Sequence, residues 1–264
     1  PLIALVALPL LIEALGTARA GVLFLIWTVL NYFNLFQFGL GRALTKFIAE
    51  RLGEGNEGEV STLVWTGTLL MVGLGAIATV SMFVAAPWLV HYQLKVPEEL
   101  RGETVQAFYV FGLSMPVIIS VAAFKSVLEA YQRFGLKNGL QVALGVLNYA
   151  GLLVIVLFSR SLVSMSWFVA AGGLLAWIVH LVVCARVAPS ILRGITFKRS
   201  VIGPLVSFGG WDTVRSLIQP IIMYSDRFFI GSIVSMSAVA YYTTAYEVVN
   251  KMWILPTSLV GVVF

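Results

Sequence analysis

Six charged side chains lie in one otherwise apolar stretch, residues 201–251, and their types suit them to hold an ion or a polar ligand. A charged side chain at the centre of a membrane helix costs at least about 2.5–3.5 kcal/mol. Such residues therefore face the inside of a helix bundle or a water-filled cavity, and they line pathways for ions or substrates. We expect such a cavity here. The six residues are Asp212, Arg215, Asp226, Arg227, Glu247 and Lys251.

Four polar residues in the first part of this stretch share one side of a helix. At about 100° per residue, Asp212, Arg215 and Asp226 fall within about 60° of one another, and Gln219 lies between them. This face predicts the polar wall of the cavity. Arg215 is the first candidate for contact with an anionic group. The alternative is a structural pair between Arg215 and Asp212, which are three residues apart.

The composition is that of an integral membrane protein. Hydrophobic residues make up 59% of the chain and charged residues 11%, whereas soluble domains are about 25% charged. The apolar runs suit helices that cross about 30 Å of hydrocarbon, and they lack the alternation of barrel strands about ten residues long. The expected fold class is all-α, a polytopic membrane helix bundle.

No cofactor or metal is expected to bind. The single cysteine, Cys184, excludes a disulfide within the chain and a cysteine metal cluster. His180 stands in an apolar segment without a second ligand at suitable spacing, so it is assigned to packing.

Basic residues are distributed asymmetrically over the connections between the apolar runs. By the positive-inside rule, the side with ten of them faces the cytoplasm, while the opposite side holds four. The short connections leave no basic domain for nucleic acid, which is therefore not expected as a partner. The ten are Arg42, Lys46, Arg51, Lys125, Arg133, Lys137, Arg186, Arg193, Lys198 and Arg199.

Hydropathy predicts about eight membrane helices, at residues 1–12, 21–40, 63–89, 107–124, 141–158, 166–184, 202–230 and 238–264. Both ends of the sequence fall in apolar runs, so we expect a fragment of a two-bundle transporter. Residues 1–200 would form a six-helix bundle with a truncated first helix, and residues 201–264 the start of a second bundle. An offset of 219 residues places Asn31 opposite Asn250, a weak sign of the parallel repeats between which transporters bind substrate.

Two basic segments are expected at the cytoplasmic surface. Residues 39–53 alternate apolar and charged faces at helical spacing, which predicts a short interfacial helix carrying Arg42 and Lys46. Attraction to anionic lipids would explain these charges, and capture of a lipid diphosphate is the alternative. Residues 125–138 are expected to form a basic connection.

Three strings of the sequence resemble a known family. They are GLGRALTKFIAE (residues 39–50), LEAYQRFGLKN (128–138) and FGGWDTVRSLIQPIIMYSDRFFIGSIVSMSAVAYYTTAYEVVNKM (208–252). The strings, the last above all, resemble bacterial polysaccharide-biosynthesis flippases of the O-antigen type. That family belongs to the superfamily that also holds multidrug extruders.

The resemblance implies a transporter in the bacterial inner membrane. Its substrate would be an undecaprenyl-pyrophosphate-linked oligosaccharide, moved to the outer leaflet by alternating access. Further partners would be membrane lipids, a polysaccharide polymerase and a chain-length protein. The chemistry agrees, because a diphosphate cannot cross hydrocarbon unaided, and arginine and lysine bind phosphates well.

Each candidate site residue has a structural alternative. Arg227 would contact substrate or extend to the interface, and Glu247 would pair with Lys251 four residues later. Tyr246 would stack on a sugar or anchor the helix at the interface. The substrate-binding candidates are Arg215, Lys251, Arg227, Arg42, Asn250 and Tyr246. The candidates for ion coupling or gating are Asp226, Asp212 and Glu247.

Two other functions compete with the flippase. A cation-coupled multidrug exporter needs acidic residues in the core of the first bundle, where this sequence lacks them, although Asp226 leaves that function open. A membrane enzyme of polysaccharide assembly needs an acid/base pair, a nucleophile or a metal cluster, and no convincing set is present. An enzyme is therefore not expected.

Overall fold

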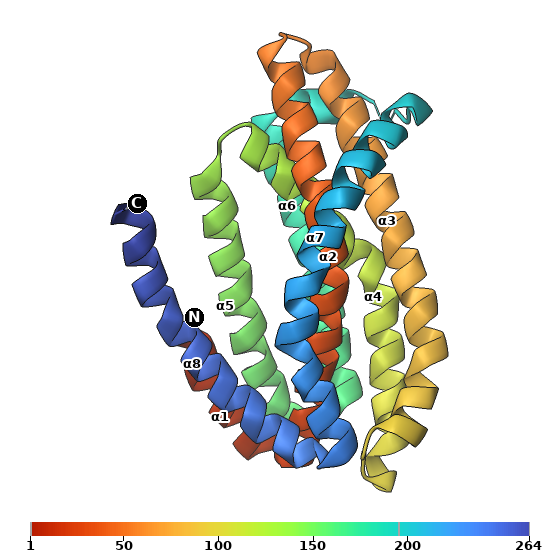
Figure 1. The fold of residues 1–264 in the computed structure, drawn as a ribbon, viewed down its shortest axis with the longest axis vertical. Helices are drawn as coiled ribbons and strands as arrows, with labels where there is room; N and C mark the ends of the chain where they lie inside the picture. Colours follow the sequence, from red (N-terminus) through yellow and green to blue (C-terminus); the bar gives the residue numbers. More distant parts are fainter. Residues whose placement is uncertain (1, 195, 264) are drawn as a thin grey trace.

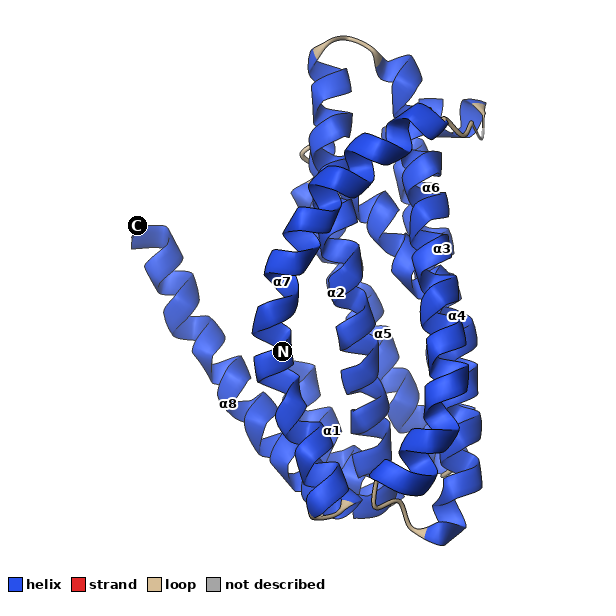
Figure 2. Cartoon of the chain, turned by 45° about the vertical axis from the view of Figure 1, so that its right-hand side comes forward, coloured by secondary structure: helices blue, strands red, loops and turns tan. Residues whose placement is uncertain are grey.

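The chain is a bundle of long helices that run roughly along one axis (Figures 1 and 2). The computed structural model describes the backbone of residues 2–194 and 196–263, and the side chains of residues 7–29, 39–192, 194, 196–211, 225–250 and 252. Over the described backbone every element is helical, so the predicted all-α fold is confirmed. The elements are α1 (Leu2–Leu15), α2 (Thr17–Gly53), α3 (Glu57–Trp88), the π-helical turn η1 (Leu89–Gln93), α4 (Glu98–Ala130), α5 (Phe134–Phe158), α6 (Leu162–Val187), the 3-10 turn η2 (Pro189–Arg193), α7 (Arg199–Ile233) and α8 (Met236–Val263).

Four segments among the described residues are long and apolar enough to cross a membrane. They are α3 with η1, α4, α5 and α6. Helix α3 points large apolar side chains such as Ile77 and Val84 outward, and α5 does the same with Leu157 and Phe158. Apolar surface of this extent does not remain in water. The chain is a multi-pass membrane protein.

The basic connections meet at one end of the bundle. The α2–α3, α4–α5 and α6–α7 connections lie at the top of Figure 1, and the other connections lie at the bottom. We call the first the basic end and the second the opposite end. Arg51, Arg133 and Lys198 lie at or beside the basic end.

The predicted interfacial helix at residues 39–53 is wrong. These residues continue α2, a single helix of 37 residues and thus about 55 Å long at 1.5 Å per residue. Their apolar face packs on protein: Leu44 is fully buried against Gly67 of α3. The hydroxyl of Ser126 in α4 donates to the Gly41 carbonyl at 2.9 Å. An apolar helix face does not reveal whether lipid or another helix covers it.

The basic connection predicted at residues 125–138 is also shorter than expected. Helix α4 runs to Ala130 and α5 begins at Phe134. Lys125 therefore belongs to α4, more than one turn before the end of that helix.

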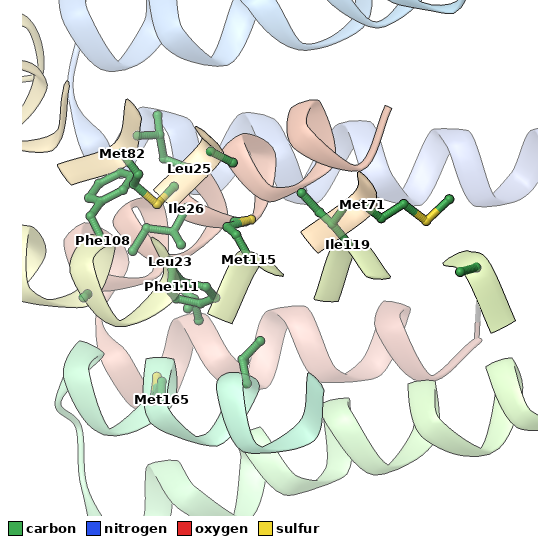
Figure 3. Packing of buried hydrophobic residues seen from close by; sticks show 14 of the residues in the cluster. Leu23, Leu25, Ile26, Met71, Met82, Phe108, Phe111, Met115, Ile119 and Met165 are labelled. Atoms are coloured by element: carbon green, nitrogen blue, oxygen red, sulfur yellow. The ribbon is translucent and has the colours of Figure 1, made fainter. Parts of the chain in front are cut away.

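The core lies between α2, α3, α4 and α6. Figure 3 shows Leu25 and Ile26 of α2 beside Met82 of α3 and Phe108 of α4. Met165 of α6 belongs to the same cluster of buried side chains.

A proline in α4 is compensated by a hydroxyl from α3. Pro116 has no N–H, so the Gly112 carbonyl four residues earlier lacks its helical donor. The Thr79 hydroxyl lies 2.6 Å from that carbonyl oxygen and donates to it. This bond fixes α3 against α4 where a backbone acceptor would otherwise be unsatisfied.

Gly75 allows the closest approach of α3 to α4. A Cβ at position 75 would lie 2.3 Å from the Pro116 Cα, a backbone atom that cannot rotate away. We expect Gly75→Ala to destabilise the protein by about 1–3 kcal/mol, the usual cost of overpacking. Thermal unfolding of the detergent-solubilised protein measures this effect. Gly73→Ala is the control, because a Cβ there meets nothing within 4 Å; equal unfolding temperatures for the two variants would contradict the prediction.

Candidate functional site

A cavity of about 830 Å³ lies inside the bundle, lined by residues of α1, α2 and α4 to α8. Its volume is within the range of small-molecule sites, about 300–1,000 Å³. Most of its lining comes from α5 and α6. The described polar side chains that line it are Lys125, Gln141, Asn148, Tyr149, His180, Arg227, Thr243, Glu247 and Asn250.

Arg227 links three helices at the wall of this cavity. Its side chain is 3% exposed, and Nη2 lies 3.3 Å from Oε1 of Glu247 in α8, which is 28% exposed. Nη1 donates to the buried Thr28 hydroxyl of α2 at 3.1 Å, and the guanidinium lies 5.1 Å from the centre of the Tyr246 ring. A buried arginine with these partners has a fixed position.

Asp226 is not among the residues that line the cavity, and its carboxylate is hydrogen-bonded to neighbouring groups. Its carboxylate accepts a hydrogen bond from the Tyr242 hydroxyl and another from the Arg227 backbone N–H at 2.7 Å. The Tyr242 ring stacks on that of Tyr246, with 6.0 Å between the ring centres. The two tyrosines connect Asp226 to the face of Arg227.

Helices α2 and α8 pack closely at the opposite end. The hydroxyls of Thr17 and Ser237 lie 2.9 Å apart, and a Cβ on Gly21 would overlap the Met236 carbonyl. Towards its C-terminal end, α8 leaves the bundle (Figures 1 and 2). The first residues of the two helices, Thr17 and Met236, are separated by the offset of 219 residues noted in the sequence.

The structure brings part of the predicted set together. Arg227, Glu247 and Asn250 line the cavity, while Tyr246 and Asp226 contact Arg227 or its neighbours. Arg42 is exposed on α2 and is not among the lining residues. Asp212, Arg215 and Lys251 lie outside the residues whose side chains are described, so their assignments stay predictions.

Glu247 has a partner that the sequence did not predict. The structure pairs Glu247 with Arg227 on α7. The pair with Lys251 stays a prediction, because the Lys251 side chain lies outside the described residues. The Arg227–Glu247 pair joins residues 20 positions apart, and helical spacing predicts only contacts within one helix.

Reasoning from the sequence missed six of the nine polar residues that line the cavity: Lys125, Gln141, Asn148, Tyr149, His180 and Thr243. Two of them had been given another role. Lys125 was assigned to a connection and His180 to packing, yet both face the cavity. Lys125 had one available signal, because no helix breaker separates it from the apolar run before it. His180 had no such signal in the sequence, since α4 and α6 are neighbours only in the folded chain.

No three His, Cys, Asp or Glu side chains within the described part of the chain lie together as a metal site.

Three comparisons with known proteins agree with this architecture. Residues 1–264 match the family described as "Polysaccharide biosynthesis protein". The "Putative O-antigen transporter" of Shigella flexneri is 27% identical over 265 residues, covering 100% of this chain and 62% of that protein. A solved structure titled "Inward-facing conformation of a multidrug resistance MATE family transporter of the MOP superfamily" has a TM-score of 0.71 at 17% identity, covering 96% of this chain and 59% of that one. This last likeness shows the fold. The chain spans about three fifths of the length of both proteins.

Proposed function

This chain belongs to the polysaccharide biosynthesis protein family, and from that premise we propose that it is the larger part of a lipid-linked oligosaccharide flippase. The substrate is an oligosaccharide on undecaprenyl pyrophosphate, which crosses the bacterial inner membrane by alternating access. Residues 1–200 form the first bundle, and residues 201–264 begin the second. The polymerase and chain-length protein of the same pathway are the proposed partners. The protein transports and does not catalyse.

The cationic cavity carries this proposal. Its described lining includes two cationic side chains, Lys125 and Arg227, and one carboxylate, Glu247, which is already paired with Arg227. An anionic cargo matches this balance, and a diphosphate is the anion that lysine and arginine bind well. Trp27 and Tyr149 also line the cavity, with 6.0 Å between their ring centres, and offer aromatic faces to sugars.

The same balance argues against a cationic drug as cargo. A cation-coupled exporter needs a carboxylate that is available to a cation or a proton. Among the described carboxylates, Glu247 pairs with Arg227 and Asp226 accepts from Tyr242. Each of these two carboxylates already has a protein partner, so neither is available to a cation or a proton.

Alternating access is supported by the difference between the two ends of α8. The start of α8 packs on α2 at the opposite end, and its last turns leave the bundle. With the basic end in the cytoplasm, the cavity would admit a headgroup from the inner leaflet while the outer side is closed.

Complementation tests the function. In a strain that lacks its own O-antigen flippase, the whole protein is expected to restore polymer at the cell surface, measured by surface labelling of the glycan. Arg215→Ala is expected to lower the signal about ten-fold or more through loss of a charge-assisted contact, and Arg215→Lys tests whether charge alone suffices. Full surface glycan with Arg215→Ala, at equal protein level, would remove Arg215 from the site. No surface glycan with the unmodified protein would contradict the proposed function.

A further inference from the structure

A second group of polar side chains lies at the basic end of the cavity, away from Arg227. Lys125 is close to the last turn of α4, and His180 lies two turns before the end of α6. Both helices end at the basic end (Figure 1). Arg227, by contrast, lies within two turns of the end of α7 at the opposite end. Lys125 and His180 therefore form a group of their own, several helical turns from Arg227.

His180 presents one ring nitrogen without a partner. Its side chain belongs to a residue that is 1% exposed, and Nδ1 lies 2.7 Å from the Ala176 carbonyl oxygen, to which it must donate. Nε2 is buried and has no hydrogen-bond partner among the described residues. Buried polar atoms are nearly always bonded, so an unpaired one on a residue that lines a cavity indicates a missing ligand.

Lys125 has no counter-ion among the described side chains. The nearby carboxylate is that of Glu129, which interacts with Lys125 electrostatically. Glu129 is already paired with Lys137 and accepts from the Thr45 hydroxyl at 3.0 Å. Lys125 and His180 line the same cavity from the neighbouring helices α4 and α6, and the charge of Lys125 acts on the His180 ring. The part of the cavity beside Lys125 therefore carries a positive charge that no described carboxylate pairs with directly.

The chemistry of the pair suits a phosphate group. A lysine ammonium binds phosphate oxygens as a point charge. The neutral His180 ring accepts at Nε2 from a protonated phosphate oxygen, and the protonated ring donates to an ionised one. Gln141 of α5 lines the same cavity and adds an amide that donates and accepts.

We propose that Lys125 and His180 form a diphosphate-binding site at the basic end of the cavity, where the headgroup of the lipid-linked substrate first binds. This assignment rests on the proposed function for the source of the diphosphate. Arg227 then belongs to a later position along the same path.

Direct binding tests the site. The whole protein is placed in phosphatidylcholine nanodiscs, and its affinity is measured for polyprenyl diphosphate, for polyprenol and, by competition, for inorganic pyrophosphate. We expect the diphosphate to bind at least about ten-fold more tightly than polyprenol, and pyrophosphate to compete with it. Lys125→Gln is expected to weaken diphosphate binding about ten-fold. His180→Phe is expected to weaken it less, and Lys125→Arg to retain it.

Lys198→Gln is the matched control. It also removes one lysine charge, but Lys198 pairs with Glu59 at 3.6 Å and lines a separate pocket of about 210 Å³. We expect it to leave binding unchanged. Protection of lysines from acetylation in the unmodified protein gives a second readout that needs no variant: the diphosphate should protect Lys125 and leave Lys198 reactive.

Several results would overturn the site. The first is an unchanged affinity for the diphosphate in Lys125→Gln. The second is a polyprenol affinity equal to that of the diphosphate, and the third is acetylation of Lys125 that the diphosphate does not reduce. Displacement of the diphosphate by phosphatidylglycerol at similar concentration would assign the site to ordinary anionic lipid. Failure of complementation, with Lys125-dependent diphosphate binding intact, would refute the flippase and leave the anion site.

Discussion

Arg227→Ala is expected to reduce surface polymer by at least about 100-fold in the complemented strain. The substitution removes a buried cation that lines the cavity, and with it the charge-assisted hydrogen bonds that we propose it makes to the diphosphate. Two such bonds, at about 1.5 kcal/mol each, give about 3 kcal/mol, or about 100-fold at 1.4 kcal/mol per ten-fold. Loss of the Arg227–Glu247 pair also destabilises the fold, and the protein level reports that separate effect. Surface labelling of the glycan, normalised to the amount of membrane-inserted protein, measures the effect.

The double variant Arg227→Ala/Glu247→Ala separates folding from transport. Removing Glu247 as well avoids a buried carboxylate that has lost its pair with Arg227, so the protein level should recover. Transport should stay low if Arg227 contacts the diphosphate. Arg160→Ala is the charge-matched control, because Arg160 is exposed in the connection between α5 and α6. Restored surface polymer in the double variant would make Arg227 a structural residue only.

A disulfide between positions 17 and 237 is expected to stop transport. The Thr17 and Ser237 hydroxyls lie 2.9 Å apart, so cysteines at these positions are close to disulfide geometry. The bond would hold α2 and α8 together at the opposite end and prevent the outward opening that alternating access requires. Transport should fall to background on oxidation and return on reduction, as measured by surface glycan appearing after a pulse of sugar label.

Removal of Cys184 and the two single-cysteine variants are the controls for the cross-link. Cys184, the one cysteine among residues 1–264, is buried and is replaced by serine in every variant. Each single variant, Thr17→Cys or Ser237→Cys, should be insensitive to oxidant. Undiminished transport by fully cross-linked protein would show that the two helices need not separate.

Much of the fold follows from the sequence because hydropathy and helix length are local properties. Long apolar runs predict spanning helices, and alternating basic connections predict which helix ends meet, as Figure 1 shows. Helix extent was harder to predict. Leu44 and Ile48 form an apolar stripe that suits lipid as well as protein, and only the folded chain shows both fully buried.

The site was only partly predictable, since its contacts join different helices. The sequence singled out Arg227 and Glu247 as charges at membrane depth, but their pairing depends on how α7 packs beside α8. Lys125 and His180 lie on different helices, and only the packing of α4 against α6 brings them to one cavity. Family resemblance was confirmed over residues 1–264, and it says nothing about these contacts.

Movement of a lipid-linked oligosaccharide between the leaflets of vesicles of defined lipid shows directly whether the protein is a flippase. The whole protein is reconstituted into liposomes that contain a fluorescent oligosaccharide on polyprenyl diphosphate, and a membrane-impermeant quencher reports its transfer between leaflets. We expect fast transfer with the unmodified protein and transfer near the protein-free rate with Arg227→Ala. Transfer no faster than in empty vesicles, or equal transfer of the same oligosaccharide on polyprenol without phosphate, would contradict the proposed function.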